Sequence, residues 1–210
     1  MKTNLPVQTD RRRVVKTLMG LAALSVSSGV LMGCTPDKPQ FKSIDLTGAD
    51  YAQGFSLTDH NGQLHILKDF AGKVVVVFFG FTQCPDVCPT SMAELAEVKQ
   101  LLGPDGDKLQ AIFITVDPER DTPELLKAYM GNFDPTFLAL RPTLEQLPQV
   151  AKDFKIYYKK VDGKTKGSYT MDHSAGSYIF DSKGRIRLYN RYGSGAEVLA
   201  SDIRLLLKTG

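Results

Sequence analysis

An uninterrupted apolar run covers Val74 to Phe79, and it predicts a β-strand that is buried on both faces. Apolar residues then recur at helical spacing at Met92, Leu95 and Val98, which predicts a helix over residues 91–102. In an open α/β sheet, ligands and reactive groups collect where a central strand gives way to the following helix. The pattern therefore directs attention to the short loop between these two elements.

The rest of the pattern predicts one mixed α/β domain without internal repeats. Further strands are expected as a hairpin over 55–67 turning at Asn61-Gly62, a buried strand over 109–116, a hairpin over 155–170 turning at Asp162-Gly163, and a hairpin over 177–189. Helices are expected over 124–131, 143–154 and 196–208, with Asp121 and Glu124 capping the first. This order of elements predicts a thioredoxin-like α/β sandwich with an N-terminal hairpin and an inserted hairpin.

The first 33 residues have the pattern of a signal peptide. A basic segment at 10–16 (DRRRVVK) precedes an uncharged stretch that ends at Cys34 and is short for a membrane span. The basic segment resembles a twin-arginine signal, with the general export route as the alternative. LMGC at 31–34 resembles a lipobox, which would place a lipid on Cys34, with an uncleaved anchor as the alternative. We therefore expect a membrane-anchored lipoprotein on the periplasmic side of a bacterial cell envelope, with a tether at 34–43 and a folded domain at 44–208.

The positive charge of the chain belongs to this leader. The whole sequence has 26 Lys and Arg against 23 Asp and Glu, a formal charge of +3. Residues 1–33 hold five of the basic residues and one of the acidic ones, so the remainder carries 21 and 22, a charge of −1. The basic balance is therefore no sign of a nucleic-acid partner.

Cys84 and Cys88 are the only cysteines beyond Cys34, and they lie in the loop after the buried strand. Three residues separate them, where a thioredoxin motif has two. If Cys88 lies in the first helical turn, the helix dipole would favour its thiolate. An exposed pair of this kind could form a static disulfide, exchange disulfides with partners, or bind a soft metal. The static bridge is the weakest reading, because so small a loop gains little stability from closure.

A third ligand decides between redox chemistry and metal binding. His60 and His65 fall in the early hairpin and are expected at the surface. His173 lies in a loop before the strand at 177, which in a thioredoxin-like fold faces the cysteine loop. Two thiolates and one imidazole suit Cu(I) and also Cu(II), with zinc as the alternative metal.

Neighbours of these residues offer further roles with ordinary alternatives. Asp172 could fix the tautomer of the His173 ring or cap a turn. Met171 could be a soft axial donor, although core packing is the stronger reading. Asp117 and Asp121 are better explained by helix capping and surface solvation than by a site for a hard cation.

Four separated motifs resemble the SCO/SenC family: FGFTQCPDVCP at 79–89, VDPERDTP at 116–123, FDP at 133–135 and DHSA at 172–175. Members of this family are membrane-tethered, thioredoxin-like copper proteins that help assemble the dinuclear copper centre of cytochrome c oxidase. The resemblance implies copper ligands at Cys84, Cys88 and His173, and supporting roles for Asp117 and Asp86. LALR at 138–141 departs from the family pattern, which affects the expected course of a surface loop and not the site.

The resemblance implies a metallochaperone that delivers copper to the oxidase or prepares the thiols of its copper-binding subunit. The alternative is an extracytoplasmic thiol–disulfide oxidoreductase in which Cys84 and Cys88 form the redox-active disulfide. Copper delivery would not make the protein an enzyme, whereas thiol reduction could. The expected partners are the copper-binding subunit of a respiratory oxidase, other periplasmic copper carriers or thiol reductants, and the membrane through the lipid.

Overall fold

The structure is a computed structural model that describes residues 39–209. The predicted signal peptide, the lipidation site Cys34 and the first part of the predicted tether lie outside the described residues. Within them, Phe41 packs partly buried against the core, and the backbone amides of Lys42 and Ser43 donate to the carboxylate of Asp202. The folded region therefore reaches back to residue 41. Among the described residues, no helix combines the length and apolar character needed to cross a membrane.

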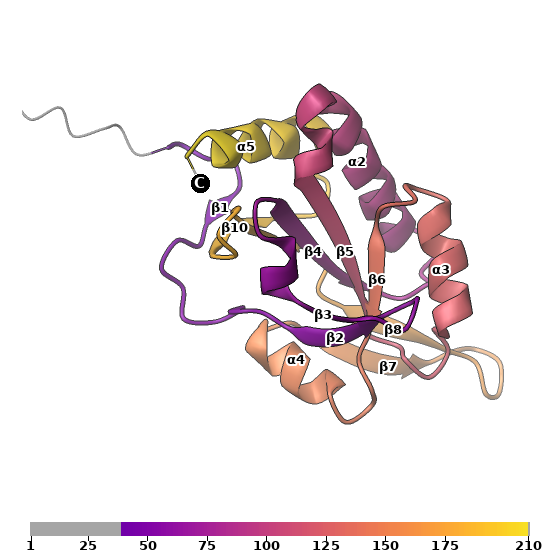
Figure 1. The fold of residues 1–210 in the computed structure, drawn as a ribbon. Coiled ribbons are helices and arrows are strands. Elements are labelled where there is room, and N and C mark those ends of the chain that lie inside the picture. Colours follow the sequence, from indigo (N-terminus) through magenta and orange to yellow (C-terminus); the bar gives the residue numbers. More distant parts are fainter. Residues whose placement is uncertain (1–38, 210) are drawn as a thin grey trace, which may run out of the picture. The chain divides into compact units, whose positions relative to one another are not determined.

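The domain is built on an eight-stranded mixed sheet in the order β1-β10-β9-β4-β5-β6-β2-β3, and β7 and β8 form a separate two-stranded sheet (Figure 1). The strands are β1 Ile44–Asp45, β2 Ser56–Asp59, β3 Leu64–Ile66, β4 Val74–Gly80, β5 Leu109–Thr115, β6 Leu138–Arg141, β7 Tyr158–Asp162, β8 Tyr169–His173, β9 Ser177–Phe180 and β10 Ile186–Asn190. The helices are α2 Val87–Leu101, α3 Pro123–Gly131, α4 Leu147–Asp153 and α5 Ala196–Thr209, with short 3₁₀ helices at Leu67–Phe70 and Gly103–Lys108.

The central strands confirm the prediction from the apolar runs. β4 and β5 pair in parallel from Val74↔Leu109 to Gly80↔Thr115, and all seven residues of each strand are buried. On its other edge β4 pairs antiparallel with β9. Strands covered on both faces are expected to be mainly apolar, and these are, with Gln110 and Thr115 as the two polar residues of β5.

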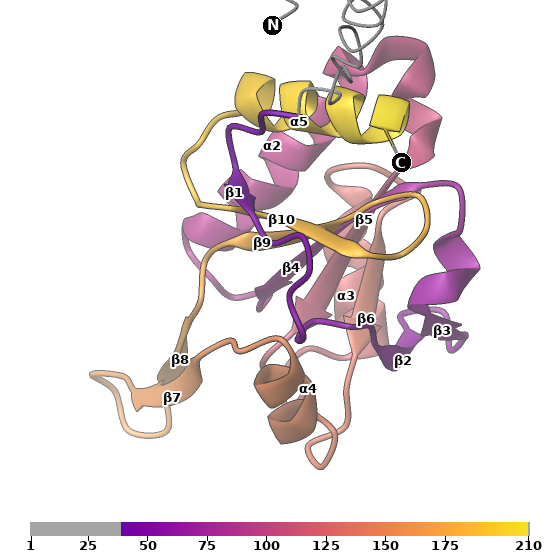
Figure 2. The same ribbon diagram turned by 90° about the vertical axis from the view of Figure 1, so that its left-hand side faces the viewer.

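Helices cover both faces of the sheet. Because parallel strands are joined by right-handed connections, α2 (from β4 to β5) and α3 (from β5 to β6) lie on the same face, and α5 packs against α2. The opposite face is covered by α4. Successive residues of a strand point to opposite faces of the sheet, so the rings of Phe78 and Phe79 lie on different faces. Phe78 contacts Phe113, whereas Phe79 contacts Phe154 at the end of α4. Figure 2 shows α4 and the β7–β8 hairpin at one end of the molecule, away from α2 and α5. The thioredoxin-like sandwich and its two hairpins are thus confirmed.

Several local predictions were wrong. The departure from the family pattern at 138–141 is the buried strand β6 and not a surface loop. The cap of α3 is Thr122, whose hydroxyl accepts from the Leu125 amide, whereas Asp121 is fully buried. His65 is also buried, against Asp59 and the ring of Phe70. For Asp121, the hydrogen bonds to Thr82 and Thr115 decide the outcome, and the local cap pattern does not contain them.

Candidate metal centre

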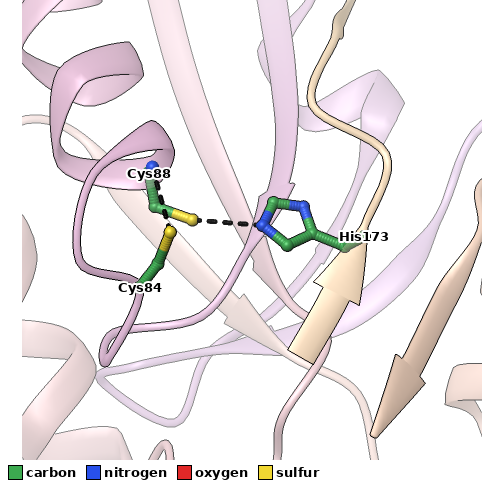
Figure 3. Close-up of side chains that lie close together, drawn as sticks. All are labelled: Cys84, Cys88 and His173. Carbon is green, nitrogen blue, oxygen red and sulfur yellow. Dashed lines mark hydrogen bonds between the residues drawn. The ribbon is translucent and has the colours of Figure 1, made fainter. Parts of the chain in front are cut away.

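Three potential metal ligands converge at the end of β4, as Figure 3 shows. The Sγ atoms of Cys84 and Cys88 and a ring nitrogen of His173 all lie within 4.8 Å of one another. Nε2 of His173 is 3.4 Å from Sγ of Cys88, and the backbone amide of Cys88 is 3.4 Å from Sγ of Cys84. No other group of three His, Cys, Asp or Glu side chains within residues 39–209 is close enough to hold a metal ion.

The buried strand β4 and helix α2 place both cysteines. The helix α2 begins at Val87, before the start predicted at residue 91, so Cys88 is its second residue and lies in its first turn. The side chain of Cys88 is fully buried. Cys84 lies in the preceding loop and is partly exposed. Gly80, the last residue of β4, allows this close packing: a Cβ there would lie 2.7 Å from Sγ of Cys88 and 2.8 Å from the ring of Phe113. Only glycine fits this position without displacing the sulfur.

A buried carboxylate fastens the cysteine loop to the neighbouring strand. Asp121 accepts hydrogen bonds from the backbone amide and hydroxyl of Thr82 and from the hydroxyl of Thr115, the last at 2.5 Å. Thr82 lies two residues before Cys84, and Thr115 ends β5. Burial raises the pKa of Asp121, while these hydrogen bonds act in the opposite direction. Asp121 therefore links the start of the cysteine loop to the rigid sheet.

His173 reaches the cysteines from the end of β8, not from the loop that the sequence predicted. The rings of Phe78 and Phe81 meet its imidazole edge-on, with centroids 6.1 and 5.7 Å away. Nδ1 lies 2.9 Å from the carbonyl oxygen of Ser174. A carbonyl only accepts, so Nδ1 carries the proton and Nε2 turns its lone pair towards the cysteines, as a metal-binding imidazole requires.

Burial sets the protonation states in the absence of metal. It lowers the pKa of His173, which keeps the imidazole neutral at pH 7 and able to bind a metal. Burial also raises the pKa of Cys88 well above the usual range, so its effect exceeds that of the helix N-terminus. The prediction of an exposed thiolate at Cys88 was therefore wrong: the metal-free side chain is a buried thiol. A metal that binds here must displace the Cys88 proton, so binding is coupled to proton release.

The arrangement fits a small, soft metal ion. Metal–ligand bonds of about 2.0–2.3 Å bring donor atoms to roughly 3.5–4 Å from one another. The observed spread of up to 4.8 Å needs only small side-chain movements to reach that geometry. Two thiolates with one imidazole suit copper, whereas zinc usually takes a fourth ligand. Among the described His, Cys, Asp and Glu residues, no fourth member belongs to this group.

The residues predicted to support the site have different surroundings. Asp117 is buried, paired with Arg120, and accepts from the hydroxyl of Tyr169 at 2.9 Å. Asp86 is exposed at the start of α2 and accepts from the Thr90 hydroxyl at 3.3 Å.

Met171 and Asp172 immediately precede His173 on β8. Asp172 is exposed, and its charge acts against the lowering of the His173 pKa by burial. The ring nitrogen Nδ1 faces the Ser174 carbonyl oxygen and not Asp172. Met171 is buried beside Val116 and Leu147, in keeping with core packing.

No sequence pattern indicated a role for Gly80, Arg120 or Tyr169, and Asp121 was predicted as a helix cap and not as a tether of the cysteine loop. The glycine at the end of an apolar strand just before the cysteine loop was a readable sign of close packing. Nothing local marks Asp121, because its partners lie 6 and 39 residues away in sequence.

Comparisons with known proteins agree with this geometry. A family model described as SCO1/SenC matches residues 45–208. The SCO2-like protein of Rickettsia felis is 34% identical over 175 residues, covering 82% of this chain and 84% of that protein. The solved structure of Bradyrhizobium japonicum ScoI with copper bound is 43% identical, with a TM-score of 0.67 over 73% of this chain and 97% of that one. A SCO1/SenC family lipoprotein from Bacillus anthracis is 27% identical, with a TM-score of 0.61 over 73% and 92%. The chain belongs to the SCO1/SenC family.

Proposed function

We propose that this protein binds one copper ion through the sulfurs of Cys84 and Cys88 and Nε2 of His173. The convergence of these three donor atoms within 4.8 Å carries the proposal. The copper-bound structure of the Bradyrhizobium japonicum relative supports the choice of metal. We further propose that copper is cargo, delivered to the dinuclear copper centre of cytochrome c oxidase.

The exposure of the ligands is suited to handing a metal on. Cys84 and His173 are partly exposed, whereas Cys88 is buried. A partner's thiolate can therefore approach the metal from the side of Cys84 and His173 while Cys88 still holds it. Proton uptake by Cys88, whose pKa burial raises, would then favour release over rebinding.

Preparation of the partner's thiols is the second candidate function, and the two cysteines favour it. Attack by the Cys84 thiolate on a partner disulfide would form a mixed disulfide and release one partner thiolate. Attack by Cys88 on Cys84 would then release the second partner thiol and leave the Cys84–Cys88 disulfide, with two electrons passed to the partner. This chemistry needs both cysteines but not His173.

The deciding experiment is a titration of the reduced domain with Cu(I) and Cu(II), comparing wild type, His173→Ala and His60→Ala. We expect about one copper per chain in wild type. Loss of one ligand removes roughly 3 kcal/mol, so His173→Ala should weaken binding about 100-fold. His60 lies on the early hairpin and accepts from the Ala139 amide, so its replacement controls for the loss of a histidine. Unchanged affinity in His173→Ala would contradict the copper proposal. Disulfide reduction by a protein that holds no copper would favour the second function.

We also propose that the protein is a lipoprotein of the bacterial cell envelope, anchored at Cys34 and exposed on the periplasmic side. The signal-like segment at 1–33 and the lipoprotein relative from Bacillus anthracis support this proposal. Mass spectrometry of the membrane fraction should find a mature N-terminus at Cys34 that carries acyl chains. A Cys34→Ala chain that stays acylated and membrane-bound would contradict it.

A further inference from the structure

The strand that carries His173 is not part of the main sheet. β8 pairs only with β7, and among the described strands neither is hydrogen-bonded to the eight-stranded sheet that holds the cysteine loop. Residues 174–176 join β8 to β9 of the main sheet, so no β-ladder fixes the distance between the imidazole and the two sulfurs, and side-chain contacts can contribute to it.

A single guanidinium contacts both segments. Nη1 of Arg120 donates to the backbone oxygen of Tyr169 on β8 at 2.9 Å and to Oε1 of Gln83 at 3.0 Å. Gln83 immediately precedes Cys84, and Tyr169 lies four residues before His173 on the same strand. One nitrogen atom is thus hydrogen-bonded both to the cysteine loop and to the strand that carries His173.

Two further contacts close this arrangement into a unit. The guanidinium carbon of Arg120 lies 3.6 Å from the centroid of the Tyr169 ring. Nε of Arg120 pairs with one carboxylate oxygen of Asp117, and the Tyr169 hydroxyl donates to the other at 2.9 Å. Asp117 is only 2% exposed, so the ion pair is well shielded from water.

We propose that Arg120, Asp117 and Tyr169 form a hairpin latch, in which Arg120 is a positioning residue that holds His173 at binding distance from Cys84 and Cys88. These contacts require a planar guanidinium group that donates hydrogen bonds in two directions while it stacks on the Tyr169 ring. The ammonium group of a lysine cannot make this combination of contacts. Nη2 of Arg120 is buried without a partner within the described chain, an unfavourable arrangement for a residue that only adds stability. The latch rests on the copper site proposed above, and it specifies how that site is kept assembled.

The test is a double-mutant cycle on copper affinity. Arg120→Ala and Arg120→Lys should each weaken copper binding about 10-fold in the wild-type background. In the His173→Ala background the same changes should leave the affinity within about twofold, because the latch acts through the missing ring. Tyr169→Phe removes only the hydroxyl and should cost about threefold.

Arg187→Ala is the matched control, since Arg187 also pairs with a buried aspartate, Asp181, and lies over an aromatic ring, that of Phe41. It should leave copper affinity unchanged. An equal loss in both His173 backgrounds, or no loss at all, would overturn the latch.

A measurement on the metal-free protein separates this proposal from the proposed function. Hydrogen–deuterium exchange of the β8 amides should be faster in Arg120→Ala than in wild type or Arg187→Ala, while β4 and β5 stay protected. If the wild type binds no copper, the proposed function fails, yet this comparison still tests the latch. Unaltered exchange in β8 would overturn it.

Discussion

The two halves of the candidate site are built in opposite ways. The cysteine half continues from β4, in which every residue is buried, and Cys88 is enclosed in the core beneath it. In the histidine half, His173 is the last residue of the two-stranded β7–β8 hairpin, which lies outside the main sheet. No residue of β7 is fully buried. Apolar packing dominates the first half, whereas the second combines the core packing of Met171 with the polar contacts of the hairpin latch.

This difference matters for a protein that must take up and release a metal. Sub-global openings start where few apolar contacts hold an element, so we expect the hairpin to open while the cysteine half stays folded. Opening would withdraw the imidazole and leave two sulfurs, a weaker site. Changes on the cysteine side should therefore cost global stability, and changes on the hairpin side should not.

Asp121→Ala should have the largest effect on stability. It leaves the buried hydroxyl of Thr115 and the half-buried hydroxyl and amide of Thr82 without their acceptor, which costs about 2–4 kcal/mol. Urea unfolding of the reduced, metal-free domain measures the change. Asp105→Ala removes an exposed pair with Lys108 and should stay within about 0.5 kcal/mol. Equal losses in the two variants would contradict a special role for the buried carboxylate.

Gly80→Ala should be the next most damaging change. The new methyl group would lie within 3 Å of the Cys88 sulfur and of two phenylalanine rings, and such overpacking costs about 1–3 kcal/mol. Copper affinity should fall as well, because the sulfur must move. The control is Gly131→Ala at the end of α3, where a Cβ meets nothing within 4 Å and stability should not fall. A Gly80→Ala protein with native stability and affinity would show that the cysteine half is less rigid than we infer.

Most of the cysteine half could be predicted from the sequence, because local patterns encode it. The apolar run 74–79 specifies a buried strand, and the helical spacing after it predicts a helix over 91–102. The observed helix begins earlier, at Val87, and this earlier start brings Cys88 into its first turn. Its burial could not be predicted in the same way. Position in a helix says nothing of what covers the side chain, and here the close approach of Gly80 does.

The histidine half was recovered less completely. The hairpin was predicted, but its connection is residues 163–168 and not a tight turn at Asp162-Gly163. The strand β8 also extends to His173, which pairs with Tyr158 at the start of β7. The hairpin latch was missed, because Arg120 and Tyr169 are 49 residues apart and neither has a distinctive local pattern. Contacts of this kind depend on the folded arrangement of loops, which hydrophobic periodicity does not contain.

Acid should weaken the main sheet through Asp181, which closes the turn between β9 and β10. Burial alone would raise the pKa of Asp181, but hydrogen bonds from Arg185, the Lys183 amide and Arg187 outweigh it and lower the pKa. Its stabilisation is therefore complete above the unfolded pKa of about 3.9 and is lost as pH falls through the lower folded pKa.

Asp181→Asn should lower the free energy of unfolding at pH 7 by about 1–2 kcal/mol and flatten its decline below about pH 4. Unfolding curves at pH 7, 4 and 3 provide the measurement. An identical acid profile in the variant would assign the acid sensitivity to other carboxylates.

Lys160→Ala should have the smallest effect, because it removes a contact of the hairpin that lies at the surface. Lys160 pairs with Glu119 at 2.9 Å, and both side chains are 50% exposed. Exposed pairs of this kind contribute about 0.2–1 kcal/mol and are screened by salt. Global stability should therefore change little, and the small change should vanish in 1 M salt. Exchange of the β7 and β8 amides should nevertheless quicken, since Lys160 also lies 3.9 Å from the centroid of the Tyr169 ring. A large loss of global stability would mean that the hairpin folds as one unit with the sheet, and the two halves of the site would then not open separately.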